Sequence, residues 1–312
     1  MKMIYNYHTD MLGHINAMRS QEERIISCHD YFPSCRPSCI QLRGTRPVDK
    51  TCRKAMVDWC FKVADAFNMR RETVWIAMSF LDRYLSSGKG KSSEALQARG
   101  EFQLAALTSF YIAVKLNEPC EMSADFLVNI CRNTYTKSNF ISTEEDILFS
   151  LEWRVSGPTP MDFVRNFLEL LPQVKNKESC DNILQHAQKY LDCATSDIYF
   201  SGCKASTVGI VCLFGAFVAS DVFTSSECDE FLLELSSMLN FDIASTDVIK
   251  VQERLLSQSP FRVRRSPSQA TLPQANSICF NKADETSSPV SVADMTCSHH
   301  SSKSLLAKSQ YS

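Results

Sequence analysis

The feature that most constrains the fold of this 312-residue chain is a run of helical patterns with one proline-rich break. Apolar residues first recur at helical spacing over five stretches, about 50–67, 71–85, 101–116, 123–133 and 136–151. The segment 156–160, Ser-Gly-Pro-Thr-Pro, cannot continue a helix. Five more patterns follow, at about 161–171, 181–198, 203–219, 227–239 and 245–256. No stretch alternates with period two for long enough to indicate a sheet, so the sequence predicts an all-α fold of two five-helix blocks.

The same pattern divides the chain into four segments. Residues 1–48 are polar and mixed, with one short helical candidate around residues 21–26. The two helical blocks are expected at 49–155 and 158–256, and Asp49 suits the N-cap of the first helix. Residues 257–312 contain 14 serines, scattered prolines and no apolar periodicity, a composition typical of a disordered tail.

Composition excludes some classes of protein. The net charge is −2 and the pI about 6.3, which argues against a nucleic-acid-binding protein with its usual basic face. The longest apolar run, Val208 to Ala219, is shorter than the ~20 residues that cross a bilayer, so it predicts a buried helix. The first twenty residues lack the apolar core and cleavage site of a secretory signal. We therefore expect no membrane association, and a location in the nucleus and cytoplasm.

The 14 cysteines are irregularly spaced, and several lie on apolar helix faces, where free cysteine behaves as a small hydrophobe. Cys28-His29 with Cys35 and Cys39 is the one cluster that resembles metal ligands. It lacks the paired Cys-x-x-Cys spacing of a structural zinc site. The sequence therefore predicts neither a metal site nor a cofactor.

Charged residues interrupt the apolar patterns of the first two helices. Arg53 lies near the start of the first, and the pair Asp82-Arg83 near the end of the second. Two antiparallel helices joined by a short turn would bring Arg53 and Asp82 side by side as a buried ion pair. The alternative is that both are ordinary surface charges on amphipathic helices.

Several motifs occur in a characteristic order. Cys52 to Trp59 reads Cys-Arg-Lys-Ala-Met-Val-Asp-Trp, and Asp82 to Ser86 reads Asp-Arg-Tyr-Leu-Ser. Ala-Val-Lys-Leu-Asn-Glu ends at Glu118, and a Glu-x-x-Ile-Leu-x-x-Leu-x-Trp pattern precedes the Pro-Thr-Pro of 158–160. Over about residues 20–256 the chain resembles the cyclins, whose fold is a tandem repeat of five helices. The second block looks most like D-type cyclins, including plant and algal relatives, although the Leu-x-Cys-x-Glu retinoblastoma-docking motif usual near their N-terminus is missing.

The resemblance implies a regulatory subunit without catalytic activity, which binds and activates a cyclin-dependent Ser/Thr kinase in cell-cycle control at G1/S. The implied partners are that kinase, kinase inhibitors and substrates. Lys115 and Glu144 match the family residues that hydrogen-bond the kinase backbone near its C-helix; read alone, they could be a solvated pair. The resemblance places around them the positions Ile112, Leu116, Glu118, Leu148, Trp153 and Val155.

A second surface implied by the resemblance is the groove that many cell-cycle cyclins use for substrates bearing Arg-x-Leu. Its positions match Cys52, Ala55, Met56, Trp59 and Gln103. The family's acidic residue is replaced here by Lys62, which would repel the arginine of such a peptide. We therefore expect docking through this groove to be altered or lost.

The tail contains three Ser-Pro sites. Ser259-Pro260-Phe261-Arg262 fits the Ser-Pro-x-basic preference of these kinases, and Ser266 and Ser288 also precede proline. Since a phosphate adds roughly −1.5 to −2 charge, we expect phosphorylation here to be linked to turnover.

The sequence gives less support to other functions. A transcription-associated cyclin, or a general transcription factor that grips DNA with cyclin-like repeats, is the alternative; the second of these would need a basic surface and paired Cys-x-x-Cys motifs. For an enzyme there is no GxxxxGK[ST] phosphate loop, and residues 88–91, Gly-Lys-Gly-Lys, are better explained as a flexible loop. No Cys/His or Ser/His catalytic arrangement is visible.

Overall fold

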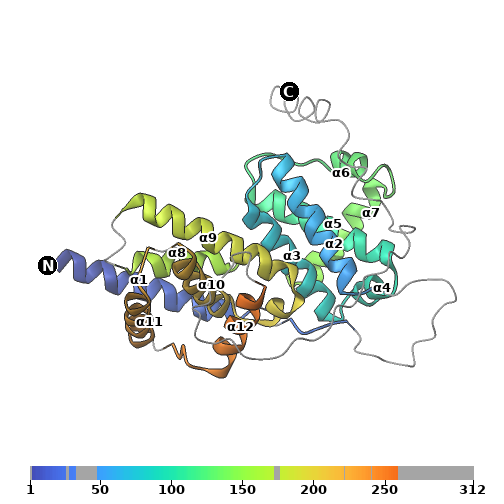
Figure 1. The fold of residues 1–312 in the computed structure, drawn as a ribbon. Helices are drawn as coiled ribbons and strands as arrows, with labels where there is room; N and C mark the ends of the chain where they lie inside the picture. The colour runs from blue at the N-terminus through green and yellow to red at the C-terminus, as the bar shows by residue number, and fades with distance from the viewer. Residues whose placement is uncertain are drawn as a thin grey trace, which may run out of the picture. The chain divides into compact units, whose positions relative to one another are not determined.

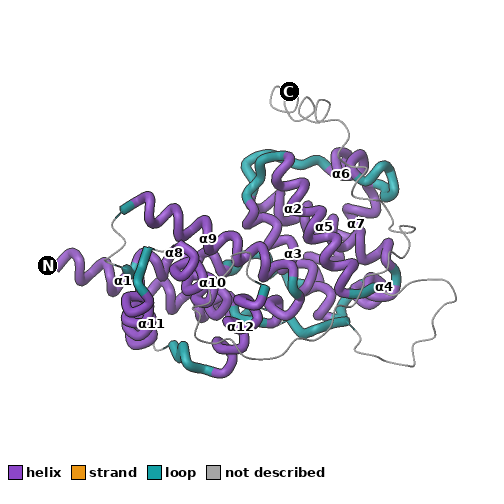
Figure 2. The backbone as a smooth tube through the Cα atoms, in the orientation of Figure 1, coloured by secondary structure: helices purple, strands orange, loops and turns teal. Residues whose placement is uncertain are grey.

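The computed structural model describes residues 2–25, 28–32, 48–171, 176–220, 222–239 and 241–258. These ranges fold into helices and contain no strand (Figure 2), which confirms the all-α prediction. They belong to one compact unit, residues 1–263. The predicted disordered tail lies outside the described residues except at its start, where Ser257 is the last residue of a helix.

Seven α-helices precede the proline-rich break in the described part of the chain: α1 Lys2–Glu22, α2 Lys50–Ala66, α3 Arg71–Ser87, α4 Ser92–Gln97, α5 Arg99–Asn117, α6 Ala124–Ile130 and α7 Lys137–Ser150. After the break come α8 Pro160–Glu169, α9 Lys177–Ser196, the 3₁₀-helix η1 Ile198–Gly202, α10 Ala205–Ser220, α11 Ser225–Leu239 and α12 Thr246–Ser257. The short elements α4 and η1 have no counterpart among the ten predicted patterns. Each is shorter than two turns, and so carries too little periodicity to be recognised.

Each block is built around one helix that is apolar on nearly every side. In the first block α5 packs against α2, α3, α4 and α7; in the second, α10 packs against α8, α9, α11 and α12 (Figure 1). Two glycines allow the close approach of α10 to its neighbours. A Cβ at Gly209 would lie 2.8 Å from the carbonyl oxygen of Pro160, and one at Gly215 would lie 2.9 Å from the ring of Tyr190. Among the described residues, no helix is both long and apolar enough to cross a membrane.

Helix α1 differs from the prediction. The sequence placed a short helix around residues 21–26, whereas the structure has a 21-residue helix that ends at Glu22. Among its residues 9–22, whose burial the structure describes, the buried side chains are Ile15 and Met18. This narrow stripe gave no periodicity to recognise, and α1 is fixed instead by tertiary packing against α8 and α11. The Arg19 Nη1 atom also donates a hydrogen bond to the carbonyl oxygen of Leu239 over 2.8 Å.

Capping residues explain where α2 and α8 begin. Asp49 is the N-cap of α2 and accepts a hydrogen bond from the Cys52 backbone nitrogen over 2.9 Å. Thr159 forms a capping box with Asp162, and Pro160 takes the first position of α8, where proline suits a helix. Pro160 therefore starts a helix rather than only ending the preceding segment.

Candidate functional site

Arg53 and Asp82 form a buried ion pair between α2 and α3. Arg53 Nε donates to Asp82 Oδ1 over 2.9 Å and Nη2 donates to Oδ2 over 2.7 Å, and both side chains are at most 3% exposed. Two further contacts were not anticipated: the Tyr31 hydroxyl donates to Asp82 Oδ1 over 2.8 Å, and Arg53 Nη1 donates to the carbonyl oxygen of Thr195 in α9 over 2.7 Å. Burial alone would lower the pKa of Arg53, but the charge and hydrogen bonds of Asp82 raise it. The pair thus joins α2 and α3 to the second block.

Lys115 and Glu144 lie together at the surface between α5 and α7. Lys115 Nζ is 2.6 Å from Glu144 Oε1. The two side chains are 43% and 16% exposed, and the Lys115 ammonium lies 4.8 Å from the centre of the Tyr111 ring. The partners therefore hold one another in a fixed position while the lysine stays accessible.

The two helices that carry this ion pair, and the turn after α7, also carry exposed apolar side chains. Leu116, next to Lys115, is 53% exposed, and Trp153 beyond the end of α7 is 60% exposed. Leu148 and Val155 are half-buried, while Ile112 is buried in the core. Ile112 can therefore support this surface from beneath but cannot touch a partner.

The sequence reasoning missed Phe149. It is 68% exposed, and its ring lies 5.9 Å from that of Trp153 at an interplanar angle of 82°. The signal was present, because the buried positions of α7 include Phe140 and Ile147, and Phe149 falls off that face. Ile141, at 45% exposure, is a second apolar residue of α7 left uncovered.

The backbone after α7 places Trp153 beside Phe149. Glu152 and Trp153 have φ angles of +54° and +58°, a left-handed conformation that non-glycine residues seldom adopt. The Trp153 nitrogen donates to the Leu148 carbonyl over 2.9 Å, and the Glu152 carboxylate pairs with Lys89 over 2.8 Å and with Arg154 over 2.9 Å. A left-handed backbone conformation at a non-glycine residue costs free energy and persists only where surrounding contacts impose it. Such conformations are common at functional sites.

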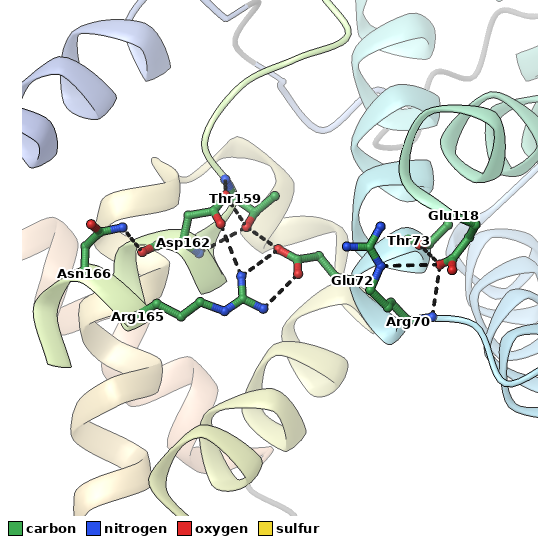
Figure 3. A network of polar contacts seen from close by, with 8 residues as sticks. All are labelled: Arg70, Glu72, Thr73, Glu118, Thr159, Asp162, Arg165 and Asn166. Carbon is green, nitrogen blue, oxygen red and sulfur yellow. Dashed lines mark hydrogen bonds and ion pairs between the residues drawn. The ribbon is translucent and has the colours of Figure 1, made fainter. Parts of the chain in front are cut away.

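Glu118 does not belong to this surface. Its carboxylate accepts hydrogen bonds from the Arg70 backbone nitrogen, over 3.0 Å, and from the Thr73 hydroxyl (Figure 3), and its side chain is only 4% exposed. Arg70 is the N-cap of α3 but forms no cap with its own side chain. Glu118 supplies the missing acceptor from the end of α5, so the prediction that it contacts a partner is corrected to an internal role.

A neighbouring polar network joins α3 to the start of α8. Glu72 accepts a hydrogen bond from the Thr159 hydroxyl over 2.7 Å and pairs with Arg165 over 3.0 Å (Figure 3). Arg165 also reaches Asp162, at 3.2 Å. The proline-rich break is therefore held against the first block by side chains from both blocks.

The positions of the expected docking groove are mostly covered. Trp59 is 4% exposed and packs edge to face on Phe110, and Met56 is also buried. Cys52 and Gln103 are half-buried, and Gln103 accepts a hydrogen bond from Tyr135 over 3.1 Å. Ala55 and Lys62 are exposed. The largest apolar side chains that a docking peptide would contact are thus part of the core.

Some predictions fall outside the described residues, namely the sites Ser259, Ser266 and Ser288 and the cysteines Cys35 and Cys39. Within the described ranges no group of three or more His, Cys, Asp or Glu side chains is arranged to hold a metal ion.

Residues 14–156 match the family model "Cyclin, N-terminal domain". Rice Cyclin-A3-2 (Oryza sativa subsp. japonica) is 28% identical over 213 residues, 68% of this chain and 50% of that protein. Mouse G1/S-specific cyclin-D2 (Mus musculus) is 24% identical over 278 residues, 88% of each chain. Human G1/S-specific cyclin-D1 (Homo sapiens) is 26% identical over 60% of this chain and 57% of its own length, so the chain spans about half the length of several curated relatives it matches.

A solved structure shows the same fold. The viral cyclin from herpesvirus saimiri superposes with a TM-score of 0.53 at 19% identity, covering 69% of this chain and 88% of the viral one. The relatives include both A-type and D-type cyclins. The motifs, the helical architecture and these comparisons agree that residues 14–156 form a cyclin N-terminal domain.

Proposed function

We propose that the protein is the regulatory subunit of a cyclin-dependent Ser/Thr kinase, which it binds and activates in cell-cycle control. The observation that carries this proposal is the surface between α5 and α7, which we call the α5–α7 surface: the ion pair Lys115–Glu144 beside the exposed side chains Leu116, Phe149 and Trp153. An apolar centre next to a few oriented charged groups is the usual composition of a binding hot spot.

The large apolar side chains of this surface need a partner. Phe149 and Trp153 are both more than half exposed, and each would bury much of its ring against another protein. Lys115 and Glu144 add donors and acceptors for a backbone segment, such as the end of a kinase helix. The surface therefore suits a partner that presents an apolar helix face and free backbone groups.

Activation follows from selective binding. A kinase whose C-helix and activation segment interconvert between inactive and active arrangements is shifted toward the active one by a partner that binds only that arrangement. The chain itself would perform no catalytic step. We further propose action at the G1/S transition, a location in the nucleus and cytoplasm, and contacts with kinase inhibitors and substrates. The names of the D-type relatives support the first of these.

Reconstitution tests the proposal. The purified full chain is mixed with a purified cyclin-dependent kinase, and phosphate transfer to a Ser-Pro peptide is measured with either component alone and with both. We expect activity only in the mixture. Lys115→Glu and Glu144→Ala should each reduce co-purification of the kinase at least tenfold, because each removes one member of the ion pair. Lys54→Glu is the matched control, since Lys54 is an exposed lysine of α2 paired with Asp58. Equal recovery of kinase by all four proteins would show the interface assignment to be wrong.

A further inference from the structure

A cleft of about 720 Å³ lies where the end of α1, helix α3, the proline-rich break and the segment from α9 to α10 meet. Its walls carry apolar side chains such as Trp75, Leu116, Phe200 and Val208, along with charged ones. Small-molecule sites typically have volumes of roughly 300–1,000 Å³ and mix apolar walls with a few oriented polar groups. The size and composition of the cleft fit that class.

Arg83 lines this cleft and is the unusual group in it. Its side chain is buried, with 4% of the residue exposed, yet its Nε atom has no hydrogen-bond partner among the described residues. The guanidinium donates a hydrogen bond from Nη2 to the carbonyl oxygen of Arg154 over 2.5 Å. Burial lowers the pKa of Arg83, and the nearby positive charge of Arg154 lowers it further. A buried cation without an anion is costly, so a site of this kind needs an explanation.

The carboxylates that line the cleft already have partners. Asp82 is bound by Arg53 and Tyr31. The two carboxylates at the end of α1 also have partners: Glu22 accepts hydrogen bonds from the Ser206 nitrogen and hydroxyl, and Glu23 pairs with Lys204.

The remaining two carboxylates belong to the network at the proline-rich break. Glu72 is bound by Thr159 and Arg165, and Asp162 accepts from the Thr159 nitrogen over 2.9 Å and also pairs with Arg165 (Figure 3). No acidic side chain of the cleft lies within ion-pair distance of Arg83 in the described part of the chain.

We propose that this cleft binds a small ligand bearing an oxyanion, whose phosphate or carboxylate group accepts a hydrogen bond from Arg83 Nε. The anion supplies the charge that the cleft lacks, and the apolar walls receive the body of the ligand. Arginine suits this role because its donors are fixed in one plane and it remains charged at any physiological pH. The cleft shares Leu116 with the α5–α7 surface, whereas Arg83 is not part of that surface.

Thermal denaturation of the full chain in sodium phosphate, in sodium acetate and in sodium chloride of equal ionic strength tests this directly. Phosphate and acetate stand for the two oxyanion classes. Binding to the native state alone raises Tm in a saturable way; for a chain of this size a tenfold excess over Kd corresponds to a rise of about 3–5 °C. We expect that rise with at least one oxyanion and not with chloride, and a matching broadening of the ³¹P signal if phosphate is the ligand.

Variants of the cleft separate a specific site from general anion binding. Arg83→Met should abolish the saturable rise, whereas Arg83→Lys, which keeps the charge but not the Nε donor, should fold and respond more weakly. Lys204→Met removes an exposed cation of the same cleft that already pairs with Glu23, and it should respond as the wild type does. No difference in Tm between oxyanions and chloride would mean that an ordered water satisfies Nε. An equal rise in Tm for Arg83→Lys and the wild type would show that Nε does not bind the anion. Either result would overturn the proposal.

Discussion

Trp75 in α3 donates its indole N–H to Asp192 Oδ1 in α9 over 2.9 Å. The other oxygen of Asp192 accepts from Arg71 Nε over 2.7 Å, and the Arg71 guanidinium lies 4.4 Å from the centre of the Phe61 ring. These contacts hold α2 and α3 against α9 of the second block, about one helical turn before Thr195, which binds Arg53. Asp192 is half-buried, and its burial raises its pKa, although the Trp75 and Arg71 contacts act in the opposite direction.

The raised pKa of Asp192 predicts a pH dependence of stability. Between the unfolded value of 3.8 and the raised folded value, the native state binds more protons than the unfolded state. The contribution of Asp192 to the free energy of unfolding is therefore fully present below pH 3.8 and is lost as the pH rises through the folded pKa. Asp192→Asn lacks this titration. Urea unfolding of both proteins from about pH 3.5 to 7 should show the wild type losing stability relative to the variant as the pH rises. A difference that grows with pH would mean that pairing with Arg71 outweighs burial.

Removing either member of the Arg53–Asp82 pair should destabilise the protein strongly. Arg53→Ala leaves the Asp82 carboxylate buried beside Tyr31, and it also removes the donor to Thr195. Truncating one partner of a buried pair typically costs about 3–5 kcal/mol, which would lower Tm by roughly 10 °C for a chain of this size. Lys54→Ala, at an exposed pair, should cost about 0–1 kcal/mol. Differential scanning calorimetry of both variants measures the contrast, and a normal Tm for Arg53→Ala would contradict it.

The double variant Arg53→Met with Asp82→Leu tests whether Arg53→Ala loses stability because a buried carboxylate is left unpaired or because packing is lost. Because no ion is left unpaired, it should recover part of the stability lost in Arg53→Ala. The recovery should stay incomplete, since the hydrogen bond to Thr195 is still missing. A double variant no more stable than Arg53→Ala would show that the loss comes from packing and from Thr195, not from the isolated carboxylate.

Phe149 and Trp153 should contribute to kinase binding without contributing to stability. Phe149→Ala and Trp153→Ala each remove an exposed ring, so we expect Kd for the kinase to rise roughly 10- to 100-fold. Tm should change by less than about 2 °C, as is usual for surface substitutions. Leu233→Ala is the matched control, because Leu233 is 72% exposed on α11. Isothermal titration calorimetry with the kinase checks all three, and equal losses in all of them would rule out a specific role for the aromatic pair.

The sequence predicted the long helices of both blocks because each carries several turns of apolar periodicity. It also suggested a pair between Arg53 and Asp82, because two antiparallel helices joined by a short turn would bring them together, although surface charges remained the alternative. It could not find α1, whose described side chains show only a narrow buried stripe at Ile15 and Met18. Contacts such as Arg53 with Thr195 lie 142 positions apart, and no local pattern encodes them.

For the site, the motifs predicted which residues lie near one another but not the direction in which each side chain points. Lys115 and Glu144, which the resemblance assigned to one site, form an ion pair. Glu118, three residues after Lys115, points the other way because α5 ends at Asn117 and the chain turns toward Arg70 and Thr73. Phe149 was overlooked for the opposite reason, since an apolar residue in an apolar helix is assigned to the core until its face is known.

Lys62 should weaken the binding of Arg-x-Leu peptides to the surface of α2. It is exposed and would repel the arginine of an Arg-x-Leu peptide, and Trp59 beneath it is covered by the chain's own packing. We therefore expect wild-type binding weaker than micromolar in fluorescence anisotropy. Lys62→Glu replaces repulsion by attraction, and at an exposed site this should strengthen binding roughly three- to tenfold.

Lys54→Glu is again the control for that experiment, because it makes the same change of charge two turns earlier on α2. If Lys62 acts locally, the gain in Lys54→Glu should be smaller than in Lys62→Glu and should vanish first as salt is raised, since screening removes the more distant interaction. A wild-type affinity in the micromolar range or better that is lost on Trp59→Ala, in a variant shown to be folded, would mean that the groove opens and that Lys62 does not prevent docking.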